Sequence, residues 1–489
     1  MKKLIYKFAL LAILLVLMNW IYGKFFLKND MLKHSKEIEL VWDVVKDSCT
    51  IVYAGESSNI TYLPSDNDKR KISDFVFDYF PNMKCGDMTK SAAHSEVYYH
   101  LFNNIPENSP VETIIITMNI RSFGYNWIES NLETPIQKYL VLLKEYPPLF
   151  NRFKLAFKAY EIKSDSERME ARLYHKQNDT FTFPYPFKYD NTADWDLGKA
   201  VQGVIDSKGK RNKNLTRLAC HYIKGYSFMI NDDNPRIKNF DDIVELAKQR
   251  GWNLIFNIMD ENVDRANELV GKDLLYLMRY NRDYLINRYG NIENVTIVNN
   301  LGELRNSLFI DQNWTTEHYS ETGRRIIANN VAQAVKKYHP DMYIECDEIE
   351  YPKNYYRINL KTDSISISNP IPYGLMIEDS TSEIESNVEK VYISAKILME
   401  ECPDEASIVM KTFKDGVEVS SKSVSLNKFT SASDKWEFVN TVFPIDSSFF
   451  DTDTFQIFLC NHSSTQVHIK SMDASFEYDD FAWNYISKQ

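Results

Sequence analysis

The chain has 489 residues, of which 44% are hydrophobic and 13% aromatic, and its formal net charge is −11. This length suffices for two or three domains, and the apolar content excludes an intrinsically disordered chain. The negative charge argues against nucleic-acid binding, because that affinity comes mainly from Lys and Arg side chains that neutralise phosphates. The sequence contains no P-loop, dinucleotide-binding glycine motif or zinc-ligand spacing, so we expect neither a cofactor nor a metal site.

Residues 1–26 are predicted to form a membrane anchor. Met1-Lys2-Lys3 precedes a mostly apolar run over 4–26, which at about 1.5 Å per residue is long enough to cross a bilayer. No small-x-small cleavage site follows, so an uncleaved signal anchor is favoured over a cleaved signal peptide. Residues 27–47 are charged and predicted to form a short helical stalk. A single N-terminal anchor before a large acidic body predicts that the bulk is extracytoplasmic, either periplasmic or at the cell surface.

Residues 48–340 are predicted to form a domain in which strands and helices alternate, which indicates a parallel sheet covered by helices on both faces. Apolar and periodic runs predict strands at 49–54, 111–117, 226–230, 252–259 and 294–298, and helices at 240–250, 263–289 and after residue 320. The stretch 127–219, with its aromatic and Pro-rich segment 181–190, breaks this alternation. We interpret it as an insertion that could roof a site, with aromatic rings that either stack on sugars or hold the insertion to its domain.

Three short segments place reactive side chains at the ends of these elements. Ser57 follows Gly55 directly after the first strand, Asn119 follows the second strand, and His318 precedes a helix that Ser320 could cap. Ser, Asn and His supply the nucleophile, oxyanion donor and base of an acyl-transfer site. Each also has a simpler interpretation: Ser57 as a helix cap, Asn119 as a turn residue, and His318 as a histidine bound to a backbone carbonyl.

Taken together, the three segments resemble the SGNH/GDSL hydrolase superfamily over roughly residues 49–338. Gly55-Glu56-Ser57 is similar to its Gly-Asp-Ser block, Thr117-Met118-Asn119-Ile120 to its Gly-x-Asn-Asp block, and Thr315-Thr316-Glu317-His318 to its Asp-x-x-His block. The resemblance implies a flavodoxin-like three-layer α/β/α sandwich with a parallel sheet. It further implies that Ser57 attacks an acyl carbonyl while His318 takes its proton, and that Asn119 and the Ser57 backbone N–H hold the oxyanion.

The sequence departs from the family pattern at two functional positions. Thr315 stands where the triad Asp is expected, so His318 is oriented by Asp311 or Glu317, or forms a dyad with Ser57 without an acid. Asp311 is preferred because it ends an apolar run. The block that supplies an oxyanion Gly corresponds to residues 90–95, which lack a Gly. A backbone N–H of Ala93 or His94 could serve instead.

Residues 341–489 change to the two-residue period of antiparallel strands. Strands are predicted at 392–399, 408–412, 436–442, 455–459 and 472–476, with 393, 395, 397 and 399 facing inward. Seven or eight strands at this spacing predict an antiparallel β-sandwich, similar to the jelly-roll modules that often bind carbohydrate. Candidates for a binding face are Trp436, Tyr478, Phe481 and Trp483, and Cys402 could pair with Cys460.

Two functions therefore stay open. The first is a membrane-anchored, extracytoplasmic serine ester hydrolase or O-acyltransferase that acts on an acylated, in particular acetylated, glycan. The second is a non-catalytic surface protein in which a degenerate SGNH scaffold binds glycan or another protein. The joint presence of Ser57, Asn119 and His318 favours the enzyme, whereas the missing triad Asp and oxyanion Gly favour the binding protein.

Overall fold

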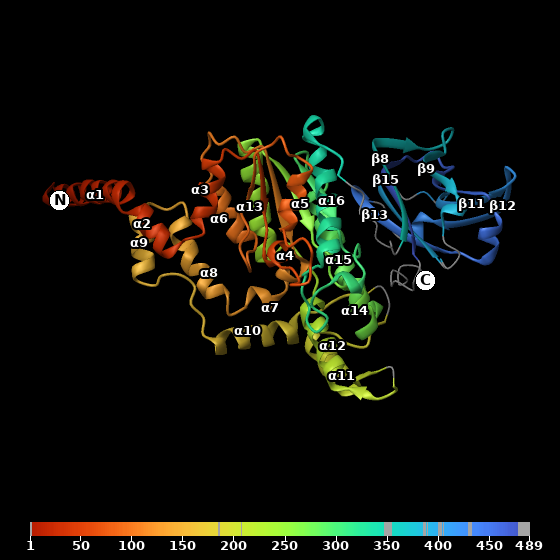
Figure 1. Cartoon of the computed structure of the whole chain (residues 1–489), viewed down its shortest axis with the longest axis horizontal. Coiled ribbons are helices and arrows are strands. Elements are labelled where there is room, and N and C mark those ends of the chain that lie inside the picture. Colours follow the sequence, from red (N-terminus) through yellow and green to blue (C-terminus); the bar gives the residue numbers. More distant parts are fainter. Residues whose placement is uncertain are drawn as a thin grey trace. The chain divides into compact units, whose positions relative to one another are not determined.

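The computed structural model describes residues 2–183, 186–206, 208–346, 355–384, 388, 390–399, 403, 405–428 and 433–477. The chain separates into two compact units, Met1–Asn262 with Tyr289–Ile349, and Val263–Arg288 with Glu350–Gln489 (Figure 1). The domain bounds inferred from the sequence, at residues 48, 340 and 341, remain predictions.

The first unit begins with three helices, α1 (Lys2–Phe25), α2 (Leu27–His34) and α3 (Ile38–Lys46). By length and composition, the 23 residues Lys3–Phe25 of α1 could cross a membrane, and all but Asn19, Tyr22 and Gly23 are exposed in this structure. The amphipathic helix α3 buries Ile38, Val41 and Val44 and contacts β2 and α6. This part of the predicted stalk is therefore packed against the rest of the unit.

A five-stranded parallel sheet forms the centre of the first unit. Its strands are β1 (Ile51–Ala54), β2 (Cys85–Asp87), β3 (Thr113–Met118), β6 (Asn253–Ile258) and β7 (Val295–Asn299). They lie in the order β2-β1-β3-β6-β7, and all four pairings are parallel. This is the flavodoxin-like order, in which the winding direction reverses between β1 and β3 and ligands bind beyond the carboxyl ends of the strands.

Helices cover both faces of this sheet. Helix α6 (Ser95–Asn103) packs against α13 (Pro235–Arg250), and α5 (Ile72–Asp78) packs against α16 (Glu321–Lys336). Figure 1 shows α6 and α13 on one side of the sheet and α5 and α16 on the other. The predicted flavodoxin-like three-layer α/β/α sandwich is confirmed.

Two of the predicted elements need correction. The predicted strand at 226–230 is wrong, because Tyr226 ends helix α12 (Lys213–Tyr226) and completes its buried face with Tyr222 and Ile223. The predicted helix at 263–289 is two helices, α14 (Val263–Leu269) and α15 (Lys272–Tyr289). They are separated at Gly271, whose φ of 111° no L-residue adopts readily.

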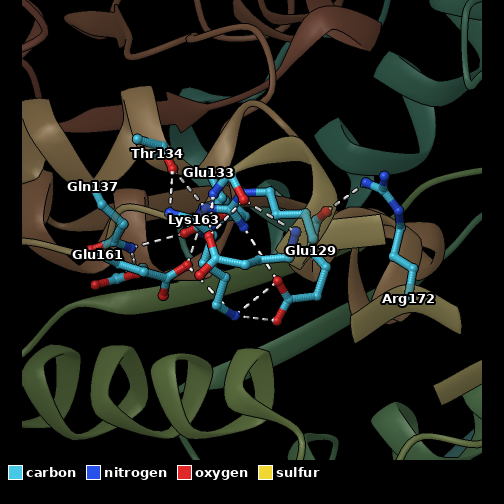
Figure 2. A network of polar contacts seen from close by, with 12 residues as sticks. Glu129, Glu133, Thr134, Gln137, Glu161, Lys163 and Arg172 are labelled. Atoms are coloured by element: carbon cyan, nitrogen blue, oxygen red, sulfur yellow. Dashed lines mark hydrogen bonds and ion pairs between the residues drawn. The ribbon is translucent and has the colours of Figure 1, made fainter. Parts of the chain in front are cut away.

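The stretch between β3 and β6 is mostly helical. Its elements before α13 are α7 (Tyr125–Ile128), α8 (Glu133–Leu140), α9 (Pro148–Ala156), α10 (Asp165–Asn178), α11 (Thr192–Gln202), the short hairpin β4 (Val204–Ile205) and β5 (Arg211–Asn212), and α12. A buried polar network attaches α10 to the segment that joins α7 to α8. Arg168 lies 3.3 Å from Glu129 and 2.8 Å from the Thr134 hydroxyl. Figure 2 shows Lys163 and Arg172 approaching Glu129 from two further directions.

The second unit contains two four-stranded antiparallel sheets. The strands are β8 (Tyr355–Ile367), β9 (Tyr373–Ser380), β10 (Lys390–Met399), β11 (Ala406–Lys414), β12 (Val417–Ser425), β13 (Ser433–Pro444), β14 (Thr454–Asn461) and β15 (Val467–Glu477). The orders β13-β10-β15-β8 and β12-β11-β14-β9 are those of a jelly roll. The predicted sandwich is confirmed, although β8, β9 and β12 were not predicted.

The predicted inward side chains of β10, from Ile393 to Met399, are buried in the core between these sheets. Trp436 is half-buried, with the Lys470 ammonium 4.8 Å from its ring centre. Cys460 is a buried free thiol. The other proposed binding-face residues, Tyr478, Phe481 and Trp483, and the proposed disulfide partner Cys402, lie outside the described residues.

Candidate active site

The turn after β1 presents Ser57 at the carboxyl edge of the sheet, beside the switch point between β1 and β3. Gly55 makes this turn possible, because a Cβ there would lie 2.8 Å from Thr89 Oγ1 and 2.9 Å from Asn59 Cβ. Ser57 begins the short helix α4 (Ser57–Ile60), whose N-cap is Glu56. The interpretation of Ser57 as the helix cap is therefore wrong, and its hydroxyl, at the partly exposed position of this turn, is available for other contacts.

The Ser57 hydroxyl contacts the His318 imidazole, which in turn contacts the Asp311 carboxylate. His318 Nε2 lies 3.1 Å from Ser57 Oγ, and His318 Nδ1 lies 2.7 Å from Asp311 Oδ2. Thr316 Oγ1 also donates to Asp311 Oδ2. Both imidazole nitrogens thus contact side chains, in the order hydroxyl, imidazole, carboxylate that activates a serine nucleophile. The interpretation of His318 as bound to a backbone carbonyl is wrong.

A short pairing of two extended segments fixes the imidazole opposite its acid. Phe309 and Tyr319 form an antiparallel bridge, and Ile310 N–H donates to the His318 carbonyl at 2.8 Å. Ser320 then caps α16 by accepting a hydrogen bond from Gly323 N–H. His318 is therefore held between a paired segment and an anchored helix, which is the rigidity that a general base needs.

Glu317, the other candidate acid, faces a different partner. Its carboxylate is fully buried and accepts a 2.7 Å hydrogen bond from Arg121 Nη2. Arg121 belongs to the 3₁₀ turn Ile120–Phe123 after Asn119 and also donates to the Thr315 carbonyl. The structure thus brings Asp311 to His318 and engages Glu317 in a buried ion pair.

Glu56 contacts both the Ser57 hydroxyl and the Asn119 amide. Asn119 Nδ2 lies 3.4 Å from Glu56 Oε1, and Glu56 Oε2 lies 3.5 Å from Ser57 Oγ. Burial, and then the charge of Glu317, raise the pKa of the Glu56 carboxyl, while Arg121 opposes this rise. The neutral acid form of Glu56 is therefore favoured beside the hydroxyl.

Two residues that the sequence analysis did not single out extend this buried group. Glu261 accepts a hydrogen bond from the Tyr226 hydroxyl, and burial followed by the charge of Glu317 raises the pKa of Glu261 well above its usual range. Glu261 lies just after β6, at the same carboxyl edge as Ser57 and Asn119. Glu261 could have been predicted from this position, because the residues that follow β6 reach the same edge of the sheet as those that follow β1 and β3.

The segment 90–95, in which an oxyanion N–H was expected, has a strained residue. Ala92 has a φ of 59°, in the left-handed region that favours glycine. Ala93 N–H donates to the Lys90 carbonyl at 3.0 Å, so it is engaged within the turn. The His94 side chain accepts from Arg236 at 2.6 Å and lies 3.3 Å from Glu133. Burial, with Arg236 beside it, lowers the pKa of His94 and keeps the imidazole neutral.

A pocket lies against this edge. Its wall includes Glu56 and Asn119 from the sheet edge and His94, the residue before α6. Trp127, Leu132 and Ile136, from the region predicted to be an insertion, supply apolar surface, and the remaining lining residues are Ala92, Ala93, Ser122, Ser130, Glu133 and Arg236. The pocket is therefore mostly apolar near Trp127 and polar near Arg236.

Among known proteins, the chain is similar to solved structures only. No protein-family model and no curated protein matches the chain. The chain is similar to a GDSL-like lipase from Bacteroides thetaiotaomicron, with 11% identity and a TM-score of 0.26 over 60% of this chain and 91% of the lipase. It is also similar to a protein named as an acylhydrolase from Bacteroides fragilis, with 10% identity and a TM-score of 0.25 over 59% of this chain and 86% of that protein.

A further likeness is to the VP2 subviral particle of infectious bursal disease virus, with 12% identity and a TM-score of 0.18 over 27% of this chain and 34% of VP2. The fold assignment above rests on strand order and register, and none of these likenesses bears on activity.

Proposed function

We propose that this chain is a membrane-anchored serine ester hydrolase or O-acyltransferase that acts on an acylated glycan, most simply an acetylated one. The observation that carries the proposal is the contact of Ser57, His318 and Asp311, which join segments 261 residues apart in sequence. Their meeting point is the carboxyl edge of the sheet at its switch point, where flavodoxin-like folds bind ligands.

In the proposed reaction, Ser57 Oγ attacks the acyl carbonyl carbon while His318 Nε2 accepts the hydroxyl proton. Asp311 accepts the His318 Nδ1–H hydrogen bond and stabilises the imidazolium. When the tetrahedral intermediate collapses, the C–O bond to the alcohol breaks, and His318 returns the proton to the leaving oxygen. Water or a sugar hydroxyl then attacks the acyl-enzyme by the reverse sequence, which gives hydrolysis or transfer.

The oxyanion of the intermediate would be held by Asn119 Nδ2 and by the Ser57 backbone N–H. A backbone N–H at the start of a helix has no partner within the helix, and Ser57 is the first residue of α4. With Ala93 N–H engaged by Lys90, the N–H of His94 or of Ala92 is the candidate for a third donor. Each such donor is worth about 3–4 kcal/mol of transition-state stabilisation.

Glu56 would assist as a neutral acid. An ionised Glu56 would place a negative charge 3.4 Å from the Asn119 amide nitrogen, where it would oppose the developing oxyanion. The protonated carboxyl instead orients the Asn119 amide without adding charge. Glu56 is therefore a positioning residue in this proposal, acting through Asn119.

The pocket suggests the kind of acyl group. Trp127, Leu132 and Ile136 form its apolar side next to Asn119, and a small apolar pocket beside the oxyanion donor fits a short acyl chain such as acetyl. The glycan is inferred from the family resemblance and from the appended jelly roll. The length and composition of α1 support membrane anchoring with an extracytoplasmic body.

The proposal favours an enzyme over the alternative of a non-catalytic binding protein with a degenerate scaffold. A binding protein has no need for a serine hydroxyl that contacts an imidazole backed by a carboxylate, and this contact supports the enzyme. The distinction is testable by covalent labelling.

The test is labelling of the full chain in detergent or nanodiscs with a fluorophosphonate probe, which modifies activated serines. Wild type and Ser109→Ala should label equally, because Ser109 Oγ is buried and makes no hydrogen bond among the described residues. Ser57→Ala should not label. A folded wild-type protein that stays unlabelled would contradict the proposal, whereas release of acetate from an acetylated sugar, with or without an acceptor sugar, separates hydrolysis from transfer.

A further inference from the structure

Helix α9 (Pro148–Ala156) carries a row of exposed aromatic side chains. Phe150, Phe153 and Phe157 are 50%, 42% and 79% exposed, and Tyr146, just before the helix, is 54% exposed. At about 100° per residue, the three Phe positions fall within an arc of about 60° on one face. Asn151 and Leu155 lie on the opposite side and are buried. The exposed face is therefore an aromatic ridge, which we define as Tyr146, Phe150, Phe153 and Phe157.

The ridge belongs to a helix that is fixed to the end of α1. Leu149 N–H donates to Asn19 Oδ1 at 2.9 Å, which satisfies the polar side chain within the apolar helix. Asp30 accepts hydrogen bonds from both Tyr22 and Arg152, each at 2.8 Å. Figure 1 shows α9 running across the C-terminal end of α1 rather than alongside it.

The length of α1 sets the depth at which α9 would meet a bilayer. The apolar stretch Lys3–Phe25 has 23 residues and spans about 35 Å, which exceeds a hydrocarbon core of about 30 Å. Its last turns carry Trp20, Tyr22 and Lys24, the residue types that anchor a helix at the membrane–water boundary. Since α9 attaches between Asn19 and Tyr22, it lies at this same level.

The chemistry of the ridge also fits this boundary. Lys154 lies on the helix between the rings, with its ammonium 4.9 Å from the Tyr146 ring centre and 6.0 Å from that of Phe150. A Lys beside aromatic rings can extend toward lipid phosphates while the rings contact acyl chains. A ridge facing only water would leave four large aromatic side chains exposed together, which is uncommon on soluble surfaces.

We propose that α9 lies in the headgroup region of the bilayer that α1 crosses, with its aromatic ridge turned toward the acyl chains. This inference rests on the proposed membrane anchoring by α1 and is independent of the proposed ester chemistry. The helix would then act as a second contact that restrains the first unit at the lipid surface instead of leaving it on a free tether.

The test places a photoreactive benzoylphenylalanine at single positions of the full chain in vesicles of phosphatidylethanolamine and phosphatidylglycerol with a radiolabelled lipid tracer. The matched control for Phe150 is Leu173 of α10, which is also 50% exposed, and Leu14 within α1 reports insertion of the anchor. We expect lipid adducts at 14 and 150, with those at 150 at least about fivefold above those at 173, as for an interfacial helix.

Four outcomes would overturn the inference. Adducts at 14 but only background at 150 would retain the anchor and remove the interfacial role of α9. Equal adducts at 150 and 173 would mean non-specific lipid contact, and adducts at 150 to a second protein chain would identify a protein interface. Absence of adducts at 14 would refute the anchor itself, and the inference with it, while fluorophosphonate labelling of Ser57 would still report on the ester chemistry.

Discussion

The contact between Asp311 and His318 gives the sharpest quantitative prediction. Asp311 Oδ2 lies 2.7 Å from His318 Nδ1. At this separation a unit negative charge stabilises an imidazolium by about 6 kcal/mol at an effective dielectric constant of about 20, and by about 1.5 kcal/mol at about 80. Because 36% of the Asp311 side chain is exposed, the value lies between these limits. We expect Asp311→Asn to remove about 3 kcal/mol of transition-state stabilisation, or about 10²-fold in kcat/KM.

This expected loss is smaller than the roughly 10⁴-fold cost of the same change at a buried triad acid, because solvent screens part of the Asp311 charge. The assay is hydrolysis of p-nitrophenyl acetate, followed together with the rate of fluorophosphonate labelling. Asp179→Asn is the matched control, since Asp179 lies 3.1 Å from His175 Nδ1 and its side chain is 42% exposed. Asp311→Asn with activity within about twofold of wild type would refute the assignment of Asp311 as the acid.

Four further substitutions test the surroundings of the site and the attachment of α10. Burial and a neighbouring carboxylate raise the pKa of Glu56 in the folded protein. As pH rises above the ordinary carboxyl range, Glu56 loses its proton in the unfolded chain first. The free energy of unfolding therefore falls until the pH reaches the folded-state pKa. Glu56→Gln should therefore flatten the decline of Tm as pH rises above the ordinary carboxyl range and keep activity, whereas an unchanged slope would contradict a raised pKa of Glu56. Ala92→Gly should relieve the positive φ of 59° and raise the free energy of unfolding by up to about 1 kcal/mol, and a lower value in urea denaturation would count against strain there. Arg168→Met should cost about 3 kcal/mol and expose α10 to limited proteolysis, because it leaves the buried Glu129 with fewer partners. Lys163→Met, at a more exposed contact with Glu129, should cost less than about 1 kcal/mol, and equal losses in the two variants would refute the argument from burial.

The predictable part of the fold is the part with long apolar runs. Strands β1, β3 and β6 are buried almost throughout, so their β-branched sequences identify them directly. Strand β2 has only three residues, Cys85-Gly86-Asp87, and none is fully buried, so it gives no comparable signal. The wrong strand at 226–230 arose because the aromatic end of a buried helix and a short buried strand look alike in sequence.

The site was predictable in its reactive residues and less so in its acid. We predicted Ser57 and Asn119 because each comes directly after a strand of one parallel sheet, and His318 because it comes directly before a helix. The choice between Asp311 and Glu317 depends on burial, which alternates from Thr315 to Ser320 so that Glu317 is buried and its neighbours Thr316 and His318 are partly exposed. Adjacent side chains of an extended segment point to opposite sides, so Glu317 cannot share the side of His318.

The acid that contacts His318 comes from the segment paired with it, so none is needed at Thr315. The bridge between Phe309 and Tyr319 places Asp311 on the facing segment, from which its carboxylate reaches the imidazole across the pair. Glu317 is then left to face Arg121 in the interior. The acid comes from across the bridge instead of from three residues before the histidine.

The buried carboxyl groups beneath the site support one conclusion about its charge. Glu56, Glu261 and Glu317 share the influence of one guanidinium, that of Arg121. Three ionised carboxylates around one cation in a buried place would be strongly unfavourable, so protons must remain on part of the group. Glu317 has the direct 2.7 Å contact with Arg121, whereas burial and the charge of Glu317 raise the pKa of both Glu56 and Glu261. A neutral Glu56 beside Ser57 then follows from the charge balance of the interior, and it is also the form that an oxyanion held by Asn119 requires.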